Sequence, residues 1–244
     1  MKLRTKKQVY FLIGILISAV LVWVLFRNID FQDLLVALKG ANYLWLIPNV
    51  ILIVLTMYQR AFRWRFMVAP MGRVPFSKLV AATWIGFMAN NVLPLRLGEF
   101  VRAYSLSWQH RRITKSASLA TIFVERMVFD LVALLLIFGA VLYLSPVSLD
   151  ESMHYGLNIT IIAALFGLIF ILIMALKPVQ TSRILTKYLF FIPNSGKEII
   201  QGVILKFSRG LEFLTDLRAV NWVALQTILI WVLMGLSNLF VFKA

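Results

Sequence analysis

The sequence predicts an all-α protein: a polytopic membrane helix bundle of five transmembrane helices and one re-entrant helical hairpin, in a single membrane domain over residues 1–244. Hydrophobic residues make up 61% of the 244 residues, and the mean hydropathy is +0.87. A soluble domain cannot bury that fraction of apolar side chains. The apolar residues also form runs of about 20, the length of a helix that crosses a bilayer. These five runs are Val9–Phe26, Tyr43–Tyr58, Ser116–Leu144, Gly156–Leu176 and Trp222–Phe242.

The first run follows the basic cluster Met1–Lys7, a combination that also occurs in signal peptides. Its apolar part is too long for a signal peptide, and no small-residue cleavage site follows, so we expect a retained helix. We expect its N-terminus in the cytoplasm, with the protein in the cytoplasmic (inner) membrane. After this run, Phe31, Leu34, Leu35 and Leu38 share one helical face. That segment either lies on the outer membrane surface or packs on neighbouring loops.

A sixth apolar run, Leu79–Leu95, is broken by charged residues and is expected to begin a hairpin over residues 79–108. Basic residues are dense on both sides of it, in Arg65–Lys78 and in Arg102–Lys115. Basic loops stay on the cytoplasmic side of a membrane, so we expect both segments there. The loop Ser145–Tyr155 carries two acidic residues and no Lys or Arg, and we expect it outside. If the broken run enters the membrane and returns to the same side, all three loops lie on the side that their charges predict.

The tip of this hairpin contains a proline and a glycine, which we expect to form its hinge. Pro94 would end the first half-helix because the residue before a proline avoids helical geometry, and Gly98 permits a tight or closely packed restart. The second half-helix, Leu97–Trp108, would point its positive N-terminal end into the membrane, where it favours an anion. Asn90 and Asn91 either line a polar path or cap the half-helix.

A second group of charged residues interrupts the run Ser116–Leu144. An ionised group at bilayer depth costs at least a few kcal/mol, so such groups face a partner or a wet cavity. Helical geometry places Arg126 and Asp130 on one face, whereas Glu125 lies about 100° away, toward a different neighbour. We predict that Glu125 or Asp130 lies within salt-bridge reach of Arg96 or Arg102, so that both charged clusters form one site.

The residue types indicate how such a site would work. A guanidinium suits bidentate binding of phosphate, so the arginines are candidates for binding a lipid phosphate. The carboxylates would hold those arginines and carry protons. The alternative is a purely structural ion network that joins the hairpin to its neighbour. The candidate lipid-phosphate ligands are Arg96, Arg126, Arg102 and Arg63, and the candidate ion-network residues are Glu99, Glu125 and Asp130.

Two further segments have amphipathic or aromatic character. The segment Arg60–Arg65, which contains Trp64, either recognises anionic headgroups at the inner leaflet or anchors the orientation of its helix. Over about residues 197–218, apolar residues recur on one helical face opposite charged ones, which predicts a cytoplasmic amphipathic helix. That helix either lies on the membrane or packs on neighbouring loops.

The sequence also excludes several kinds of site. The chain has no cysteine, so disulfides and cysteine metal sites are excluded. His110 and His154 lie in loops without ligand spacing, so we expect no metal. No nucleotide-binding loop and no Ser/His/Asp set is present, so we expect no cofactor and no enzyme activity. The formal net charge of +15 sits mostly in short loops beside helix ends, which argues against a nucleic-acid partner.

The chain resembles the lysylphosphatidylglycerol synthase membrane-domain (flippase-like) family over most of its length. The resemblance implies a lipid site, because the membrane half of multiple peptide resistance factors moves aminoacylated phospholipids between leaflets. Other members are stand-alone proteins of bacteria and archaea. The matching residues are Arg63-Trp64, then Asn91-Val92-Leu93-Pro94-Leu95-Arg96-Leu97-Gly98-Glu99 with Arg102, then Glu125-Arg126 and Asp130.

The expected function is therefore the binding and transbilayer movement of an anionic phospholipid or polyprenyl-phosphate lipid. The alternatives are a membrane enzyme that acts on a lipid phosphate, and a truncated, non-transporting scaffold. Two features depart from the family pattern. Its lysyl-transfer activity resides in a soluble domain that has no counterpart here, and relatives continue into a Pro-Gly-Gly-x-Gly-x-x-Glu segment and additional helices, whereas this chain ends at Ala244. We expect a truncated product, or one that needs a homo-oligomer or a partner subunit.

Overall fold

The computed structural model describes residues 14–16, 19–24, 26–27, 31–144, 151–188 and 193–244. All regular secondary structure in these ranges is helical, and no strand occurs among them. The predicted all-α membrane bundle is therefore confirmed as a fold class. Three described stretches are long and apolar enough to cross a membrane: Tyr43–Met71, Tyr155–Leu176 and Leu217–Lys243.

The other two predicted crossings are seen in part. The first lies partly outside the described residues, of which 14–16 and 19–24 are helical. The run predicted over Ser116–Leu144 forms three successive helical segments without a break: α6 (Lys115–Val124), the π-helix η4 (Glu125–Asp130) and α7 (Leu131–Leu144). The number of five crossings stays a prediction.

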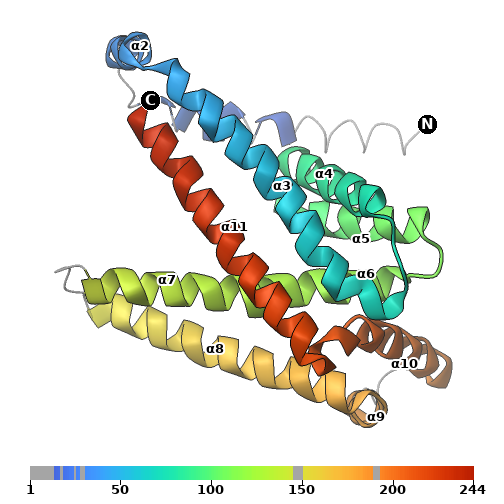
Figure 1. Cartoon of the computed structure of the whole chain (residues 1–244). Coiled ribbons are helices and arrows are strands. Elements are labelled where there is room, and N and C mark those ends of the chain that lie inside the picture. The colour runs from blue at the N-terminus through green and yellow to red at the C-terminus, as the bar shows by residue number, and fades with distance from the viewer. Residues whose placement is uncertain (1–13, 17–18, 25, 28–30, 145–150, 189–192) are drawn as a thin grey trace, which may run out of the picture.

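Two antiparallel helix pairs organise the bundle (Figure 1). Helix α3 (Leu46–Val68) lies along α11 (Leu217–Lys243), and α7 lies beside α8 (Glu151–Leu176). Where α3 begins and α11 ends, the Asn42 amide donates to the Ala244 carbonyl over 2.6 Å. Near that end, α2 (Phe31–Gly40) exposes the apolar side chains Phe31, Leu34, Leu35 and Leu38, as the sequence pattern predicted for a surface element.

The predicted hairpin consists of α4 (Phe76–Val92) and α5 (Gly98–Gln109), which pack side by side next to α3 (Figure 1). The two ends of the hairpin meet, because Lys78 Nζ donates to the Gln109 carbonyl over 2.7 Å. The chain thus enters and leaves the hairpin at the same end of the bundle. Its insertion into a membrane stays a prediction.

The turn of the hairpin differs from the predicted hinge. Leu93 is extended before Pro94, as expected, but the left-handed residue of the turn is Leu95, with φ 58°. Gly98 makes the closely packed restart that the sequence predicted, because a Cβ there would overlap the Gly86 carbonyl oxygen. This pair of glycines lets α4 and α5 approach closely.

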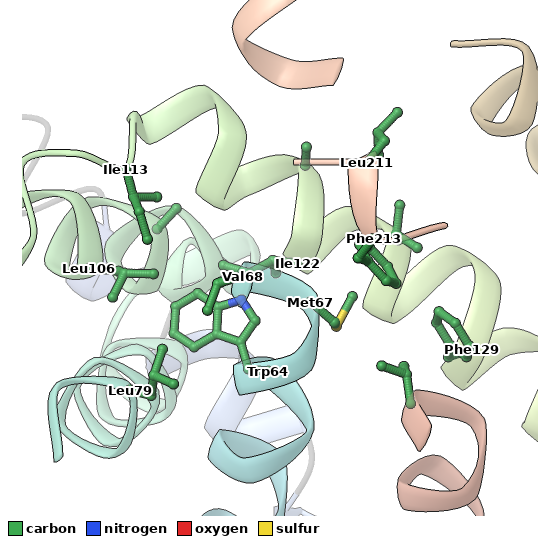
Figure 2. Close-up of a cluster of buried hydrophobic side chains, with 14 of the residues drawn as sticks. Trp64, Met67, Val68, Leu79, Leu106, Ile113, Ile122, Phe129, Leu211 and Phe213 are labelled. Carbon is green, nitrogen blue, oxygen red and sulfur yellow. The ribbon is translucent and has the colours of Figure 1, made fainter. Parts of the chain in front are cut away.

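The largest hydrophobic core lies where α3 ends and the hairpin begins. Trp64 stands at its centre and is fully buried, among side chains from α4, α5, α6 and the segment before α11 (Figure 2). Its indole Nε1 donates to Thr121 Oγ1 over 2.8 Å, which satisfies the buried polar atom. The other labelled members of this cluster are Met67, Val68, Leu79, Leu106, Ile113, Ile122, Phe129, Leu211 and Phe213.

The amphipathic helix predicted over residues 197–218 is shorter at its C-terminal end. After α9 (Pro178–Tyr188), helix α10 covers Asn194–Arg209, and a 3-10 turn, Glu212–Thr215, leads to α11. The helix ends where Gly210 packs against the Ala117 carbonyl oxygen, a contact too close for any Cβ. Its apolar face packs on α6, with the rings of Phe207 and Phe123 6.3 Å apart. Val203 of that face is exposed, so the packing on α6 covers only part of it, and a position of α10 on the membrane surface stays a prediction.

Candidate functional site

One continuous ion network joins α3, the hairpin and the π-helix among the described residues. Every member is an arginine or a carboxylate, and each lies within 4.0 Å of an opposite charge. The network lies inside a chain with membrane-spanning helices, where ionised groups are expected to meet partners. Its members are Arg60, Arg63, Glu99, Arg102, Glu125, Arg126 and Asp130.

Glu125 is the centre of the network and is fully buried. One of its oxygens lies 2.8 Å from Nη2 of Arg63, and both lie 3.1 Å from Nη1 of Arg102. The guanidinium of Arg102 also stacks on Trp64, 4.0 Å from the ring centroid. A single carboxylate therefore holds together α3, α5 and the π-helix. The prediction that the two charged clusters meet is confirmed by the contact of Arg102 with Glu125.

Asp130 extends the network toward its accessible edge. It accepts from Nη1 of Arg63 over 2.7 Å and from Nη1 of Arg126 over 3.0 Å. Arg126 in turn donates from Nε to Glu99 over 2.7 Å. The side chains of Arg126 and Glu99 are about one quarter exposed, at 28% and 27%. These two residues form the open rim of an otherwise buried cluster.

The π-helix explains how Glu125 and Asp130, five residues apart, both reach Arg63. In an α-helix, Glu125 would point about 100° away from Arg126 and about 140° away from Asp130, toward a different neighbour. Over Glu125–Asp130 the helix is wider, with bonding between residues five apart. Arg63 consequently contacts both carboxylates. Hydropathy carries no signal for this widening, so the sequence prediction missed it.

The two asparagines have different partners. Asn90 Oδ1 accepts from the Gly98 amide over 2.8 Å and so caps α5, the second of the two predicted alternatives. Asn91 donates to the Phe87 carbonyl of its own helix over 3.1 Å and is exposed. The first amide of α5 is thus occupied by the protein itself, which weakens the case for an anion at that helix end. Arg96 lies in the turn Pro94–Arg96, and its side chain is outside the described part of the structure.

The segment Arg60–Arg65 is not an interfacial anchor over most of its length. Arg63 and Trp64 are fully buried, and Arg65 is the one exposed residue of this segment. The helix continues past the apolar run because its arginines meet carboxylates from a distant segment. Hydropathy counts the charged residues but carries no information on their partners, so the predicted run ended at Tyr58, whereas α3 continues to Val68.

Arg60 is a member of the network that the sequence did not place in the site. It is 5% exposed, yet its nearest carboxylate oxygen, on Asp130, is 4.0 Å away. Its Nη2 donates to the thioether of Met234 over 3.0 Å, whereas Nε and Nη1 have no hydrogen-bond partner. The ring of Phe87 lies 5.2 Å from its guanidinium carbon. Arg60 is therefore the least satisfied cation of the cluster.

The described residues contain no group of three or more His, Cys, Asp or Glu side chains able to hold a metal ion.

Comparison with known proteins identifies a family. A family model described as the lysylphosphatidylglycerol synthase TM region matches residues 11–244, which is nearly the whole chain. No curated protein and no solved structure gives a match.

Proposed function

The chain belongs to the lysylphosphatidylglycerol synthase TM region family, and from this premise we propose that it binds the headgroup of an anionic or polyprenyl-phosphate lipid and moves the lipid between leaflets. Family membership implies a membrane role that involves lipids.

The charge imbalance of the network carries the proposal. It contains four arginines, namely Arg60, Arg63, Arg102 and Arg126, against three carboxylates, namely Glu99, Glu125 and Asp130. A positive charge in excess is costly inside a membrane protein unless an anion accompanies it. In a bilayer the abundant anions are lipid phosphates, and an arginine binds phosphate through paired N–H donors.

The hairpin supports movement of a lipid rather than binding alone. Apart from Arg96 the turn is apolar, and apolar side chains at it and beside it are exposed: Val92, Leu95 and Phe100 are 77%, 91% and 58% exposed. A turn in water is normally polar, so these side chains favour a tip that inserts into the bilayer. The hairpin also reaches the network directly, through Glu99 and Arg102 of α5. A membrane-embedded hairpin in contact with the charged site would form one wall of a path for the headgroup.

Leaflet exchange in proteoliposomes tests the proposal. Phosphatidylcholine vesicles with a trace of phosphatidylglycerol fluorescently labelled on one acyl chain are treated with dithionite, which quenches outer-leaflet label only. We expect vesicles that contain the protein to lose the protected inner-leaflet signal, and protein-free vesicles to retain it. Labelled phosphatidylcholine serves as the zwitterionic control.

The same vesicles separate the alternatives. Lipids recovered after the assay are analysed by mass spectrometry, and we expect the labelled headgroup to be unchanged. Conversion of the headgroup would indicate an enzyme. A protected signal that equals the protein-free control, with no headgroup change, would contradict the proposal and favour a scaffold.

A further inference from the structure

Arg60 lacks the close carboxylate contact that each of the other arginines in the network makes, because its one ion pair, with Asp130, is 4.0 Å long. Arg63 is held by Glu125 and Asp130, Arg102 by Glu125, and Arg126 by Glu99 and Asp130. Asp130 already accepts close bonds from two arginines, so it has little capacity left for a third at 4.0 Å.

The contacts that Arg60 does make are weak. A thioether sulfur such as that of Met234 is a poor acceptor, and the Nε and Nη1 atoms have none. A buried guanidinium with two donors lacking acceptors and only one long ion pair is costly, so its retention calls for an anion that is not part of the chain.

Arg60 lines a groove between α3 and α11 that is suited to such an anion. The groove has a volume of about 300 Å³, and the Phe87 ring of α4 also lines it. Between Arg60 and Asn49, eleven residues earlier on α3, the helix rises on the order of 16 Å. Polar side chains from both helices line this length: Asn49, Thr56, Ser237 and Asn238.

The composition of the groove indicates which anion it accepts. Its walls mix these hydroxyl and amide groups with the apolar side chains Ile53, Met57 and Val241. A free inorganic anion gains nothing from the apolar lining, whereas the glycerol or acyl portion of a lipid does. Both helices have the length and hydropathy of membrane spans, so the groove opens to a lipid environment.

We propose that Arg60 binds the phosphate of a membrane lipid that lies in the α3–α11 groove. This assignment rests on the proposed function and names the residue and the helix pair that would hold the ligand. Two parallel N–H donors of the guanidinium would face two phosphate oxygens, and the ligand charge would neutralise the excess positive charge of the network.

Binding by the purified full chain in a mild neutral detergent tests the assignment. Wild type, Arg60→Gln and Arg65→Gln are titrated with fluorescent phosphatidylglycerol, and Kd is measured by thermophoresis. Arg65 is the matched control because it is an exposed arginine of the same helix. We expect Arg60→Gln to weaken binding by about tenfold or more, as for loss of a charge-assisted bidentate contact, and Arg65→Gln to match wild type.

Thermal unfolding of the same variants separates a ligand role from a structural one. Arg60→Gln leaves three arginines and three carboxylates, all paired, so we expect its apparent Tm without lipid to equal or exceed that of wild type. Lipid should raise the Tm of wild type and not that of Arg60→Gln. A lower Tm without lipid together with an unchanged Kd would show that Arg60 is structural, and would overturn the assignment.

The remaining outcomes are also decisive. If wild type binds phosphatidylglycerol and moves it between leaflets while Arg60→Gln does both equally well, the Arg60 assignment fails and the proposed function stands. Saturable binding of inorganic phosphate that displaces the lipid from wild type but not from Arg60→Gln would assign the groove to a free anion. If wild type neither binds nor moves an anionic lipid, both proposals fail.

Discussion

At the scale of single residues, burial and pairing decide which charges hold the structure together. Glu125 is fully buried and accepts from two arginines of two different helices. Removing one partner from a buried ion pair leaves the other charge uncompensated, which costs more than the pair itself contributes. Substitution of Glu125 should therefore lower stability, because two arginines share this carboxylate. Substitution of Arg60 should not, because no carboxylate lies at bonding distance from it.

Glu125→Ala should leave Arg63 without one carboxylate partner and Arg102 without any. We expect a loss of about 3–5 kcal/mol of stability, seen as a much lower Tm in detergent or as poor accumulation in the membrane. Glu198→Ala, at an exposed position of α10, is the control and should unfold like wild type. A Tm of Glu125→Ala within error of wild type would contradict the central position of this carboxylate.

At the scale of elements, the hairpin is defined by how closely its two helices approach. Gly86 and Gly98 face each other across α4 and α5, and neither tolerates a Cβ without overlap. Asn90 of α4 caps the first amide of α5, so the same few residues set both the approach and the start of the second helix. This packing brings Arg102, four residues after Gly98, to Glu125.

Gly98→Ala should push α5 away from α4 and from the π-helix. Overpacking of this kind costs about 1–3 kcal/mol, and we expect a lower Tm together with weaker binding of phosphatidylglycerol. Gly139→Ala is the control, because a Cβ there has no neighbour within 4 Å and alanine favours a helix by about 1 kcal/mol. Equal Tm values for Gly98→Ala and wild type would mean that the helices do not touch at this point.

At the scale of the whole molecule, the sequence predicted the architecture better than the site. Long apolar runs and basic loops suffice to predict a helical bundle with a hairpin, because hydropathy and charge act over whole segments. Partner choice could not be predicted in the same way. The burial of Arg63 depends on two carboxylates, Glu125 and Asp130, that lie more than 60 residues later in the chain.

Local geometry was equally inaccessible to the sequence pattern. The wheel used for Glu125 assumed an α-helix where the chain forms a π-helix. The end of α10 at Arg209 depends on a backbone contact of Gly210 with Ala117 of another helix. The end of α10 thus arises from tertiary packing, which overrides the local periodicity, and the apolar pattern carries no signal for the π-helix.

Cysteine labelling tests the arrangement of the molecule in the membrane. The chain has no cysteine of its own, so single substitutions report without background. We expect an impermeant maleimide to label Ser148→Cys on intact cells and to leave Ser77→Cys and Ser107→Cys unlabelled until the membrane is permeabilised. Ser148 lies outside the described residues, whereas Ser77 and Ser107 lie in the two helices of the hairpin. External labelling of Ser107→Cys but not of Ser77→Cys would mean that the hairpin crosses the membrane.

The π-helix also has a consequence for the angular phase of the helix that follows it. A π-helical turn accommodates more residues than an α-helical turn, so residues after Asp130 are displaced around the axis by roughly 100°, the angle of one residue. A one-residue deletion within Glu125–Asp130 would restore an α-helix without changing the order of residues in α7. The side of α7 turned toward α8 would then change. The orientation of that entire helix toward its neighbours is thus fixed by the same short segment that holds the buried charges.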